Sequence, residues 1–331
     1  MNTEIILSIC IASYNHGESL HPKIKRILEY TGNDLEVIIS DNGSTDGTLG
    51  ILQSISDNRL NLLSALENKG PTFNYVKALA AGTGKYVMFM TDKDSLVFEN
   101  IELVISILKN ADFATGYFTL DHKGGESNIQ YASNQFDCLQ YFAYLSKHPT
   151  GYIYKNDLLK SLNILTNFSD TTAVGYFPFE FICAELCTHQ KCAILNMPFC
   201  ITAKLILGQQ TEVSMTYSGK TGNLFFSPEK RFEMFEKYSA HLHSMHISRK
   251  IRIEMSTIIL HRAYTEAVYG YINAIQNEAM RIHYRIDPKS VGNVNIADLK
   301  TFFLKSLLRC KSAFKNNAEK VLVTVTFISK I

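Results

Sequence analysis

Polar side chains that could bind a metal ion cluster at three places in the first third of the chain, each directly after a short apolar run. The run at 5–11 is followed by polar residues at 12–15, and later runs lead into Asp41 and into the pair Asp92 and Asp94. Carboxylate oxygens are hard ligands of the kind that Mg²⁺ and Mn²⁺ prefer, usually together with phosphate oxygens of a substrate. A cation held there would neutralise the charge that builds up on a phosphate-bearing leaving group.

The spacing of Asp92 and Asp94 predicts how their side chains are presented. If the chain is still extended at this point, two residues that lie two positions apart project to the same side, and Lys93 between them points away. Asp41, one junction away, is then placed to accept a hydrogen bond from a base or a ribose. The competing interpretation is that these are turn and cap residues, and for Asp46 and Ser44 that alternative is equally good.

Alternating strands and helices are needed to bring these residues together. Short apolar runs predict strands at 5–11, 36–40, 60–66, 86–90 and 113–120, and residues at helical spacing separate them. Strands that alternate with helices of this length predict an α/β fold with a mainly parallel sheet and helices on both faces. In such sheets, ligands bind beyond the carboxyl ends of the strands, where the polar residues lie.

The second half of the chain has a different character. Mixed α and β patterns over 135–205 predict a helix near 136–146, a strand near 151–154 and a helix near 176–190. The tracts 228–283 and 297–316 predict helices, with a break at Asp287-Pro288. The net charge is −6 over residues 1–227 and +8 over residues 228–331. We therefore expect two regions, 1–225 and a basic, mostly helical 226–331.

Composition limits the class of protein. Of the 331 residues, 46% are hydrophobic and 19% are charged, as in ordinary globular proteins. No run approaches the roughly 20 apolar residues that a membrane-spanning helix needs, and the N-terminus lacks the basic start of a secretory signal. A cytoplasmic protein is expected. The seven cysteines are then expected to be free thiols, because Cys183, Cys187, Cys192 and Cys200 lack the paired spacing of a zinc site.

Three motifs give this arrangement a family resemblance. They read SICIASYN at 8–15, VIISDNGSTDGT at 37–48 and NKGPTFNYVKALAAGTGKYVMFMTDKD at 68–94. Their order and spacing resemble the donor half of a family-2 glycosyltransferase with the GT-A fold, particularly the bacterial enzymes that assemble O-antigen, capsule and related surface glycans. Two departures are Ala12, where a proline is often found, and Lys93 in the middle of the D-x-D signature. Lys93 could pair with phosphate and weaken the dependence on metal.

The resemblance implies an activity and a set of ligands. It implies an inverting transfer of a sugar from a nucleotide-diphosphate sugar, expected to be a UDP-sugar, to an acceptor hydroxyl in glycan biosynthesis. Ser13 and Tyr14 would flank the nucleobase and Asp41 would bind it. Asp92 would contact ribose or diphosphate and, with Asp94, would hold Mn²⁺ or Mg²⁺.

The resemblance also implies that one carboxylate removes the proton of the acceptor hydroxyl. It places this group beyond the D-x-D, after a strand that the segment 148–154 resembles. Glu180 is the first candidate, because its apolar neighbours would raise its pKa, and Asp170 is the second. The competing interpretation of each is a surface or capping acid.

The expected partners are a nucleotide-sugar donor and a glycan or lipid-linked acceptor, with no nucleic acid. The segment 301–315 combines apolar and basic residues, which is typical of a helix at the inner face of a membrane, of a helix packed on protein and of a homo-oligomer contact.

Two other functions fit the same residues. One is a non-catalytic nucleotide-sugar-binding or scaffold protein of the same fold. The other is a sugar-phosphate nucleotidyltransferase, which the absence of Arg and Lys from 12–18 disfavours.

Overall fold

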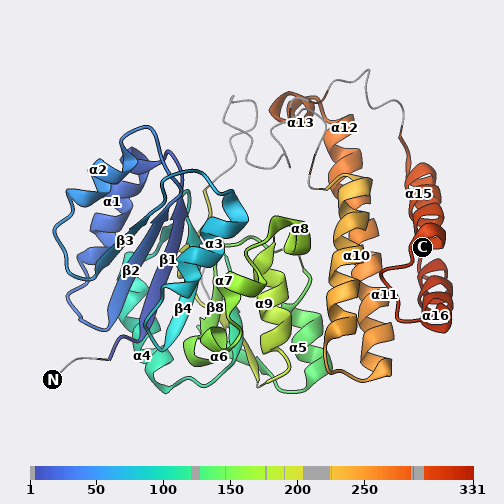
Figure 1. Cartoon of the computed structure of the whole chain (residues 1–331), viewed down its shortest axis with the longest axis horizontal. Helices are drawn as coiled ribbons and strands as arrows, with labels where there is room; N and C mark the ends of the chain where they lie inside the picture. Colours follow the sequence, from blue (N-terminus) through green and yellow to red (C-terminus); the bar gives the residue numbers. More distant parts are fainter. Residues whose placement is uncertain are drawn as a thin grey trace. The chain divides into compact units, whose positions relative to one another are not determined.

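The chain divides into two compact units, Met1–Ala203 and Lys204–Ile331 (Figure 1). The computed structural model describes residues 4–120, 127–145, 147–175, 177–189, 191–203, 224, 226–284, 286 and 294–331. The predicted division of function between 1–225 and 226–331 stays a prediction, and the predicted break at Asp287-Pro288 lies outside the described residues.

The first unit is built on an eight-stranded sheet with the order β3-β2-β1-β4-β8-β6-β9-β7. The strands are β1 (Leu7–Ser13), β2 (Leu35–Asp41), β3 (Leu60–Ser64), β4 (Tyr86–Thr91), β6 (Thr115–Phe118), β7 (Asn128–Ala132), β8 (Tyr152–Lys155) and β9 (Cys192–Asn196). Strands β1 to β4 are parallel to one another, whereas β8 runs antiparallel to both β4 and β6. The predicted α/β fold with a mainly parallel sheet is confirmed.

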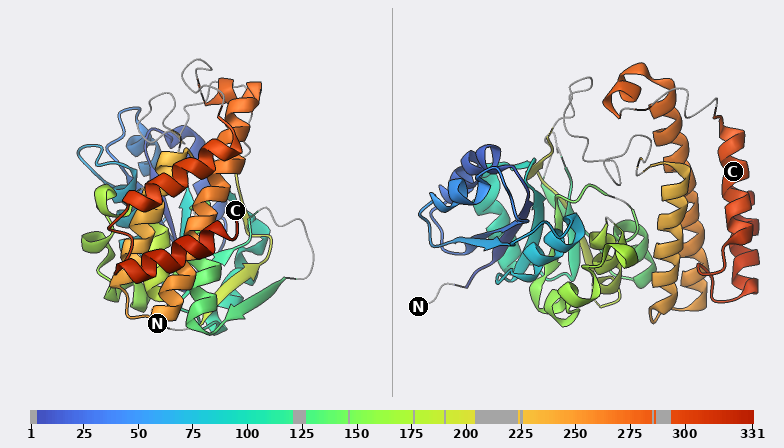
Figure 2. Two further views of the ribbon diagram at one scale, coloured as in Figure 1. Left: turned by 90° about the vertical axis from the view of Figure 1, so that its right-hand side faces the viewer. Right: turned by 45° about the horizontal axis from the view of Figure 1, so that its top comes forward.

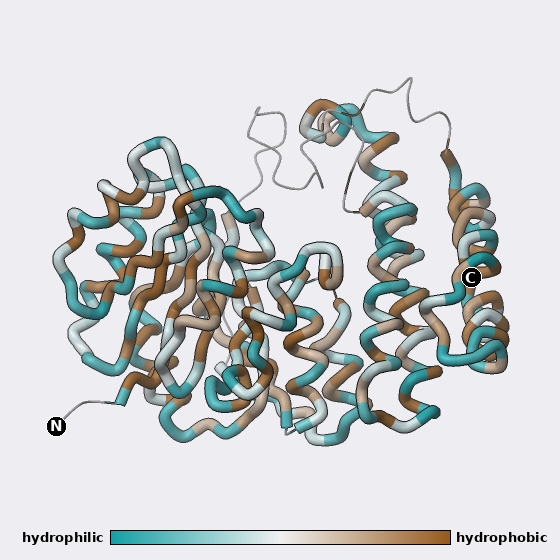
Figure 3. Tube along the Cα trace, viewed as in Figure 1, coloured by the Kyte–Doolittle hydropathy of each residue, from teal (hydrophilic) through white to brown (hydrophobic). Residues whose placement is uncertain are grey.

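Helices cover both faces of the sheet because its central strands are apolar on both sides (Figures 1 and 3). The helices that follow the first strands are α1 (Gly17–Leu28), α2 (Thr48–Gln53), α3 (Pro71–Ala80) and α4 (Ile101–Asn110). Ile9 and Met88 share one core with the buried residues of α1 and α4. On the opposite face, Phe89 packs against Tyr75 of α3 with ring centroids 5.2 Å apart. Each large side chain buried in this way contributes about 1.5–3 kcal/mol.

Short elements complete the first unit. A two-stranded antiparallel sheet joins β5 (Ser95–Leu96) to β10 (Cys200–Ile201), and a 3-10 turn, η1, spans Phe98–Asn100. The remaining helices are α5 (Gln135–Phe142), α6 (Asn156–Ser161), α7 (Ile164–Asn167), α8 (Thr171–Val174) and α9 (Pro178–Leu186). The pairing of β5 with β10 brings residues near 200 back to the end of β4.

The second unit is helical. Its elements are α10 (Pro228–Ser244), α11 (Arg249–Glu266), the π-helical η2 (Ala267–Ile272), α12 (Asn273–Gln276), α13 (Glu278–His283), α15 (Ile296–Arg309) and α16 (Asn317–Ile328). Helices α15 and α16 lie on the same side of the α10–α11 hairpin (Figure 2). Buried Glu319 of α16 pairs with Arg252 of α11 at 3.1 Å, which links the two helices. In the part of the chain that the structure describes, no helix is long and apolar enough to cross a membrane.

Candidate functional site

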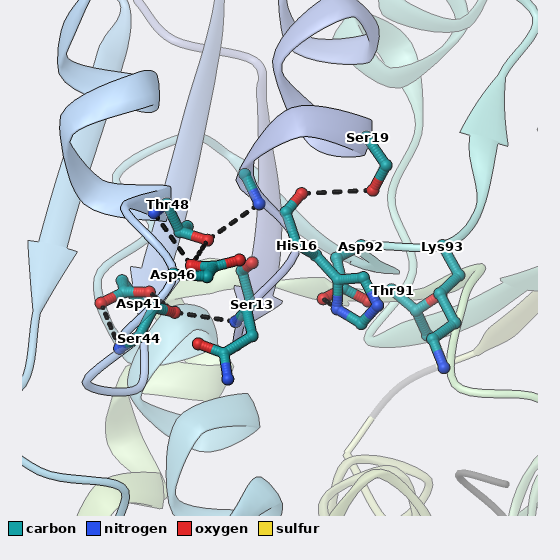
Figure 4. Close-up of polar contacts among 12 residues, drawn as sticks. Ser13, His16, Ser19, Asp41, Ser44, Asp46, Thr48, Thr91, Asp92 and Lys93 are labelled. Atoms are coloured by element: carbon teal, nitrogen blue, oxygen red, sulfur yellow. Dashed lines mark hydrogen bonds and ion pairs between the residues drawn. The ribbon is translucent and has the colours of Figure 1, made fainter. Parts of the chain in front are cut away.

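The ends of β2, β1 and β4 lie side by side at one edge of the sheet. Ser13, the last residue of β1, is in register with Asp41 of β2, and Ala12 is in register with Thr91 of β4. Figure 4 shows Asp41, Ser13 and Asp92 at this edge. The structure thus brings together the polar strand ends on which the sequence prediction depends.

Asp41 sits in a tight turn at the end of β2. Its Oδ2 accepts a hydrogen bond from the Ser44 backbone N–H at 3.1 Å, and its Oδ1 accepts one from the Ser44 hydroxyl. Asp41 is buried, with only 3% of its surface exposed. Ser44 is therefore a turn residue whose hydroxyl holds the Asp41 carboxylate in place, and it does not cap α2, which Gly47 precedes.

Ser13 and Tyr14 differ in what they offer to a ligand. The Ser13 carbonyl accepts hydrogen bonds from the Asn42 N–H at 3.0 Å and from the Asn74 amide at 3.2 Å. Its hydroxyl, by contrast, is buried and has no hydrogen-bond partner among the described residues. A buried hydroxyl of this kind is costly unless something bonds to it. Tyr14 is 38% exposed and could lie against a planar base.

Asp92 lies in a turn, so the premise of an extended strand is wrong. Strand β4 ends at Thr91, and the Asp94 N–H closes the turn by donating to the Thr91 carbonyl at 3.2 Å. The Asp92 carboxylate lies 2.9 Å from Nδ1 of His16, which precedes α1. This contact raises the pKa of His16. Lys23 reaches the same turn and donates to the carbonyls of Asp92 and Lys93, at 2.9 and 2.7 Å.

Asp94 is turned into the protein and is only 1% exposed. Its Oδ2 accepts hydrogen bonds from the hydroxyl of Thr91, at 2.7 Å, and from that of Thr150. Its Oδ1 accepts one from the Ala203 N–H at 2.8 Å. His148 Nδ1 lies 3.6 Å from Oδ2. Asp94 therefore links two distant segments, residues 148–150 and Ala203, to the end of β4.

The two predicted proton acceptors lie in contrasting surroundings. Glu180, on α9, is fully buried and accepts hydrogen bonds from the N–H groups of Leu145 and Lys147 and from the Tyr152 hydroxyl, at 2.8, 3.0 and 2.6 Å. Burial raises the pKa of Glu180, as expected from its apolar neighbours. Asp170 is exposed and caps α8 by accepting from the Thr172 N–H at 2.8 Å.

The side chains at this edge could bind a divalent cation only if the substrate supplies further ligands. Among the residues that the structure describes, no group of three or more His, Cys, Asp or Glu is arranged to hold a metal ion. Asp92 and Asp94 offer two carboxylates at neighbouring positions. Mg²⁺ and Mn²⁺ sites often consist of one or two carboxylates, water and substrate phosphates. Asp92 is thus the carboxylate that could meet a cation shared with a diphosphate, whereas both oxygens of Asp94 accept hydrogen bonds within the protein.

The sequence prediction missed four residues of this site. His16 follows β1 and could have been found by the same strand-end rule that singled out Asp41, whereas Lys23 lies within α1 and could not. His148 and Thr150 could not, because they precede β8, and only its antiparallel pairing with β4 brings them to Asp94.

The chain is similar in sequence to known proteins. Residues 8–176 match the family model described as "Glycosyl transferase family 2". The chain is 26% identical over 187 residues to the UDP-Glc:alpha-D-GlcNAc-diphosphoundecaprenol beta-1,3-glucosyltransferase WfgD of Escherichia coli, a match that covers 55% of this chain and 67% of WfgD. It is 29% identical over 128 residues to the putative teichuronic acid biosynthesis glycosyltransferase TuaG of Bacillus subtilis, which covers 37% of this chain and 51% of TuaG. The chain thus spans about two thirds of the first relative and half of the second.

Two solved structures share the fold. The structure of S. aureus TarS 1-349 in complex with UDP-GlcNAc has a TM-score of 0.59 at 13% identity, covering 98% of this chain and 91% of that one. The mannosyltransferase PcManGT from Pyrobaculum calidifontis, in complex with GDP-Man and Mn²⁺, has a TM-score of 0.52 at 14% identity, covering 99% and 88%.

Proposed function

This chain belongs to glycosyl transferase family 2, since the family model matches just over half of its length, and we propose that it transfers a sugar from a nucleoside-diphosphate sugar to an acceptor hydroxyl in glycan biosynthesis. The predicted family and the predicted GT-A fold are both confirmed. The observation that carries the proposal is the convergence of Asp41, Ser13 and the 92–94 turn at one sheet edge.

The donor is proposed to be a UDP-sugar that lies across the ends of β2, β1 and β4. Ser13 ends β1 in register with Asp41 of β2, so both residues lie at the edge where this donor would bind. Asp41, oriented by Ser44, would accept a hydrogen bond from the base, and exposed Tyr14 would lie beside it. The choice of UDP is supported by the TarS structures with UDP and UDP-GlcNAc and by the UDP-Glc named for WfgD.

Asp92 and Asp94 are proposed to hold Mn²⁺ or Mg²⁺ together with the diphosphate. Such a cation supplies Lewis-acid stabilisation of the leaving diphosphate. The chain itself fixes the two carboxylates: His16 lies against Asp92, and the hydroxyls of Thr91 and Thr150 hold Asp94. The solved structure of PcManGT with Mn²⁺ supports this choice of cofactor.

The proposed reaction inverts the configuration at the anomeric carbon. The acceptor oxygen attacks C1 from the side opposite the departing nucleoside diphosphate, and a carboxylate takes the acceptor proton. Whether that carboxylate is Glu180 or Asp170 stays a prediction. The contacts of Glu180 support a second role, in which it acts through the backbone of Leu145 and Lys147, next to His148 at the site.

The acceptor is proposed to be a glycan or lipid-linked sugar. The support comes from relatives alone: WfgD is described as acting on a diphosphoundecaprenol-linked GlcNAc, and TuaG is described as a teichuronic acid biosynthesis glycosyltransferase.

A donor screen tests the proposal. The protein is incubated with UDP-, GDP- and TDP-sugars, with Mn²⁺ and without it, and free nucleoside diphosphate is measured. We expect one UDP-sugar to be consumed in a reaction that Mn²⁺ stimulates and that Asp41→Asn suppresses. Asp112→Asn is the matched control, because Asp112 is 62% exposed and pairs with Lys155 instead of facing this edge.

Two results would count against the proposal. Tight donor binding by calorimetry without any turnover would favour the non-catalytic alternative. Failure to bind any donor, with or without Mn²⁺, would remove the nucleotide-sugar assignment altogether.

A further inference from the structure

Helix α16 of the second unit leaves four aliphatic side chains open on one side. They are 46–61% exposed and are here called the α16 stripe: Val321, Leu322, Val325 and Ile328. Their spacing places them on one side of a helix, since residues three and four positions apart are neighbours on its surface. On the opposite side, Val323 and Phe327 are buried within the unit. The helix is thus apolar on both sides, although only one side is covered.

The flanks of the stripe expose little polarity. The hydroxyl of Thr324 donates to the Lys320 carbonyl at 2.7 Å, and that of Thr326 donates to the Leu322 carbonyl at 2.8 Å. Both hydroxyls are therefore satisfied within the helix itself. A helix that is hydrophobic all round is normally buried all round, so a stripe of this kind on a surface indicates that something else covers it.

The charge around the stripe is of one sign. Between residues 299 and 331 the only acidic residue is Glu319, and it is buried against Arg252. The exposed charged residues of this segment are all basic: Lys305, Arg309, Lys311, Lys315 and Lys330. Residues 228–331 as a whole carry a net charge of +8. The stripe therefore belongs to a C-terminal segment whose exposed charged residues, from 299 to 331, are all basic.

The predicted roles of the segment 301–315 stay open. Phe303 and Leu307 are fully buried within the unit, whereas Leu308 is 71% exposed. Lys320 fixes α16 beside the end of α15 by donating to the carbonyls of Leu308 and Cys310, both at 2.7 Å. Four exposed aliphatic residues lie on α16, and α15 adds exposed Ile296 and Leu308 together with Lys305 and Arg309.

We propose that the α16 stripe and the lysines beside it form a docking surface for an anionic phospholipid bilayer. Aliphatic side chains that enter the boundary between headgroups and acyl chains, flanked by lysines that meet anionic headgroups, are the combination that peripheral membrane helices use. A second copy of the chain fits less well, because it would bring two units of the same strong charge together. The surface does not depend on the transfer reaction.

The test is flotation of the full chain with vesicles of phosphatidylcholine alone or of phosphatidylcholine with phosphatidylglycerol. We expect binding to the anionic vesicles only, weakened by salt. The double variant Leu322→Gln/Val325→Gln keeps the helix, since glutamine is a good helix former, and should lower the partition coefficient by about tenfold or more. Lys311→Gln/Lys315→Gln should lower it similarly, because each basic residue near an anionic surface contributes roughly fivefold.

A matched control is Leu103→Gln/Leu165→Gln, which changes two leucines of comparable exposure in the first unit, 45% and 42%, and should leave binding unchanged. Sedimentation velocity of the same proteins reports self-association. Equal binding by wild type and both α16-region variants would overturn the proposal. So would dissociation of an oligomer by the Leu322→Gln/Val325→Gln variant without loss of vesicle binding. Neither donor nor acceptor takes part, so failure here leaves the glycosyltransferase proposal standing.

Discussion

Replacing Glu180 by glutamine separates a positioning role from a catalytic one. The glutamate accepts from Lys147 N–H and the Tyr152 hydroxyl through Oε1 and from Leu145 N–H through Oε2. Glutamine has the same shape but only one acceptor oxygen. If this oxygen keeps the bonds of Oε1, the amide group of glutamine faces the Leu145 N–H, and one buried donor loses its partner.

The expected loss of stability follows from that single donor. An unsatisfied buried hydrogen-bonding group costs about 1–3 kcal/mol. Burial raises the pKa of Glu180 above its usual 4.5, so the ionised carboxylate itself costs some stability that neutral glutamine does not. Wild-type stability should therefore fall as the pH rises from the unfolded-state pKa through the raised folded-state value, while this contribution is absent from Glu180→Gln. The deficit of the variant should be largest at acidic pH and should shrink toward neutral pH.

The assay combines urea unfolding at several pH values with steady-state kinetics, and Tyr152→Phe is the matched variant. Tyr152→Phe removes one donor to Glu180 but keeps the carboxylate. If Glu180 acts by holding the backbone of Leu145 and Lys147, both variants should change kcat by less than about tenfold, since no group in proton transfer is lost. A fall in kcat of about 100-fold to 10,000-fold for Glu180→Gln alone, with unchanged stability, would refute the positioning argument and identify the base.

Three other substitutions have defined outcomes. Asp94→Asn should lower nucleotide release by about 100-fold or more and raise the Mn²⁺ concentration needed for half-maximal rate, and a normal Mn²⁺ titration would contradict the assigned metal role. Glu319→Ala should reduce the free energy of unfolding of the second unit by about 3 kcal/mol, because it leaves buried Arg252 without its carboxylate, and urea melts will show whether it does. Hydrogen bonds from Arg59 lower the pKa of Asp57, so the stability they add is present above the usual carboxyl pKa and is lost as the pH falls through the lowered value. Asp57→Asn should remove this loss of stability in acid. Thermal melts of wild type and variant, at pH values above and below the lowered pKa of Asp57, test this, and an equal loss in both proteins would contradict it.

The strands that could be predicted are the buried ones, because burial on both faces gives a continuous run of apolar residues. Strands β1, β2 and β4 are continuous apolar runs because both of their faces are covered by helices. Strand β7 (Asn128–Ala132) is mostly exposed and polar, and it was not predicted. Helix α16 was also missed. Its Val- and Thr-rich stretch carries no helical alternation of polar and apolar residues, and it begins with an Asn316 cap that accepts from Glu319 N–H at 3.0 Å.

The site was predictable wherever a residue directly follows a parallel strand. Asp41 and Asp92 were found by that rule alone. The environment of Asp94 could not be predicted, because its partners Thr150 and Ala203 lie 56 and 109 residues further along the chain. Such contacts depend on strand order, which local sequence patterns do not encode.

The antiparallel direction of β8 affects how enzymes with this fold can change their acceptor specificity. An antiparallel strand begins where its parallel neighbours end, so the chain before β8 delivers His148 and Thr150 to Asp94, whereas β1, β2 and β4 supply Asp41, Ser13 and Asp92. Evolution can therefore lengthen or rewrite the chain between β6 and His148 without changing the strands proposed to hold the nucleotide or the contacts to Asp94. One inherited binding site for the nucleotide-sugar donor could in this way be combined with many different acceptor specificities.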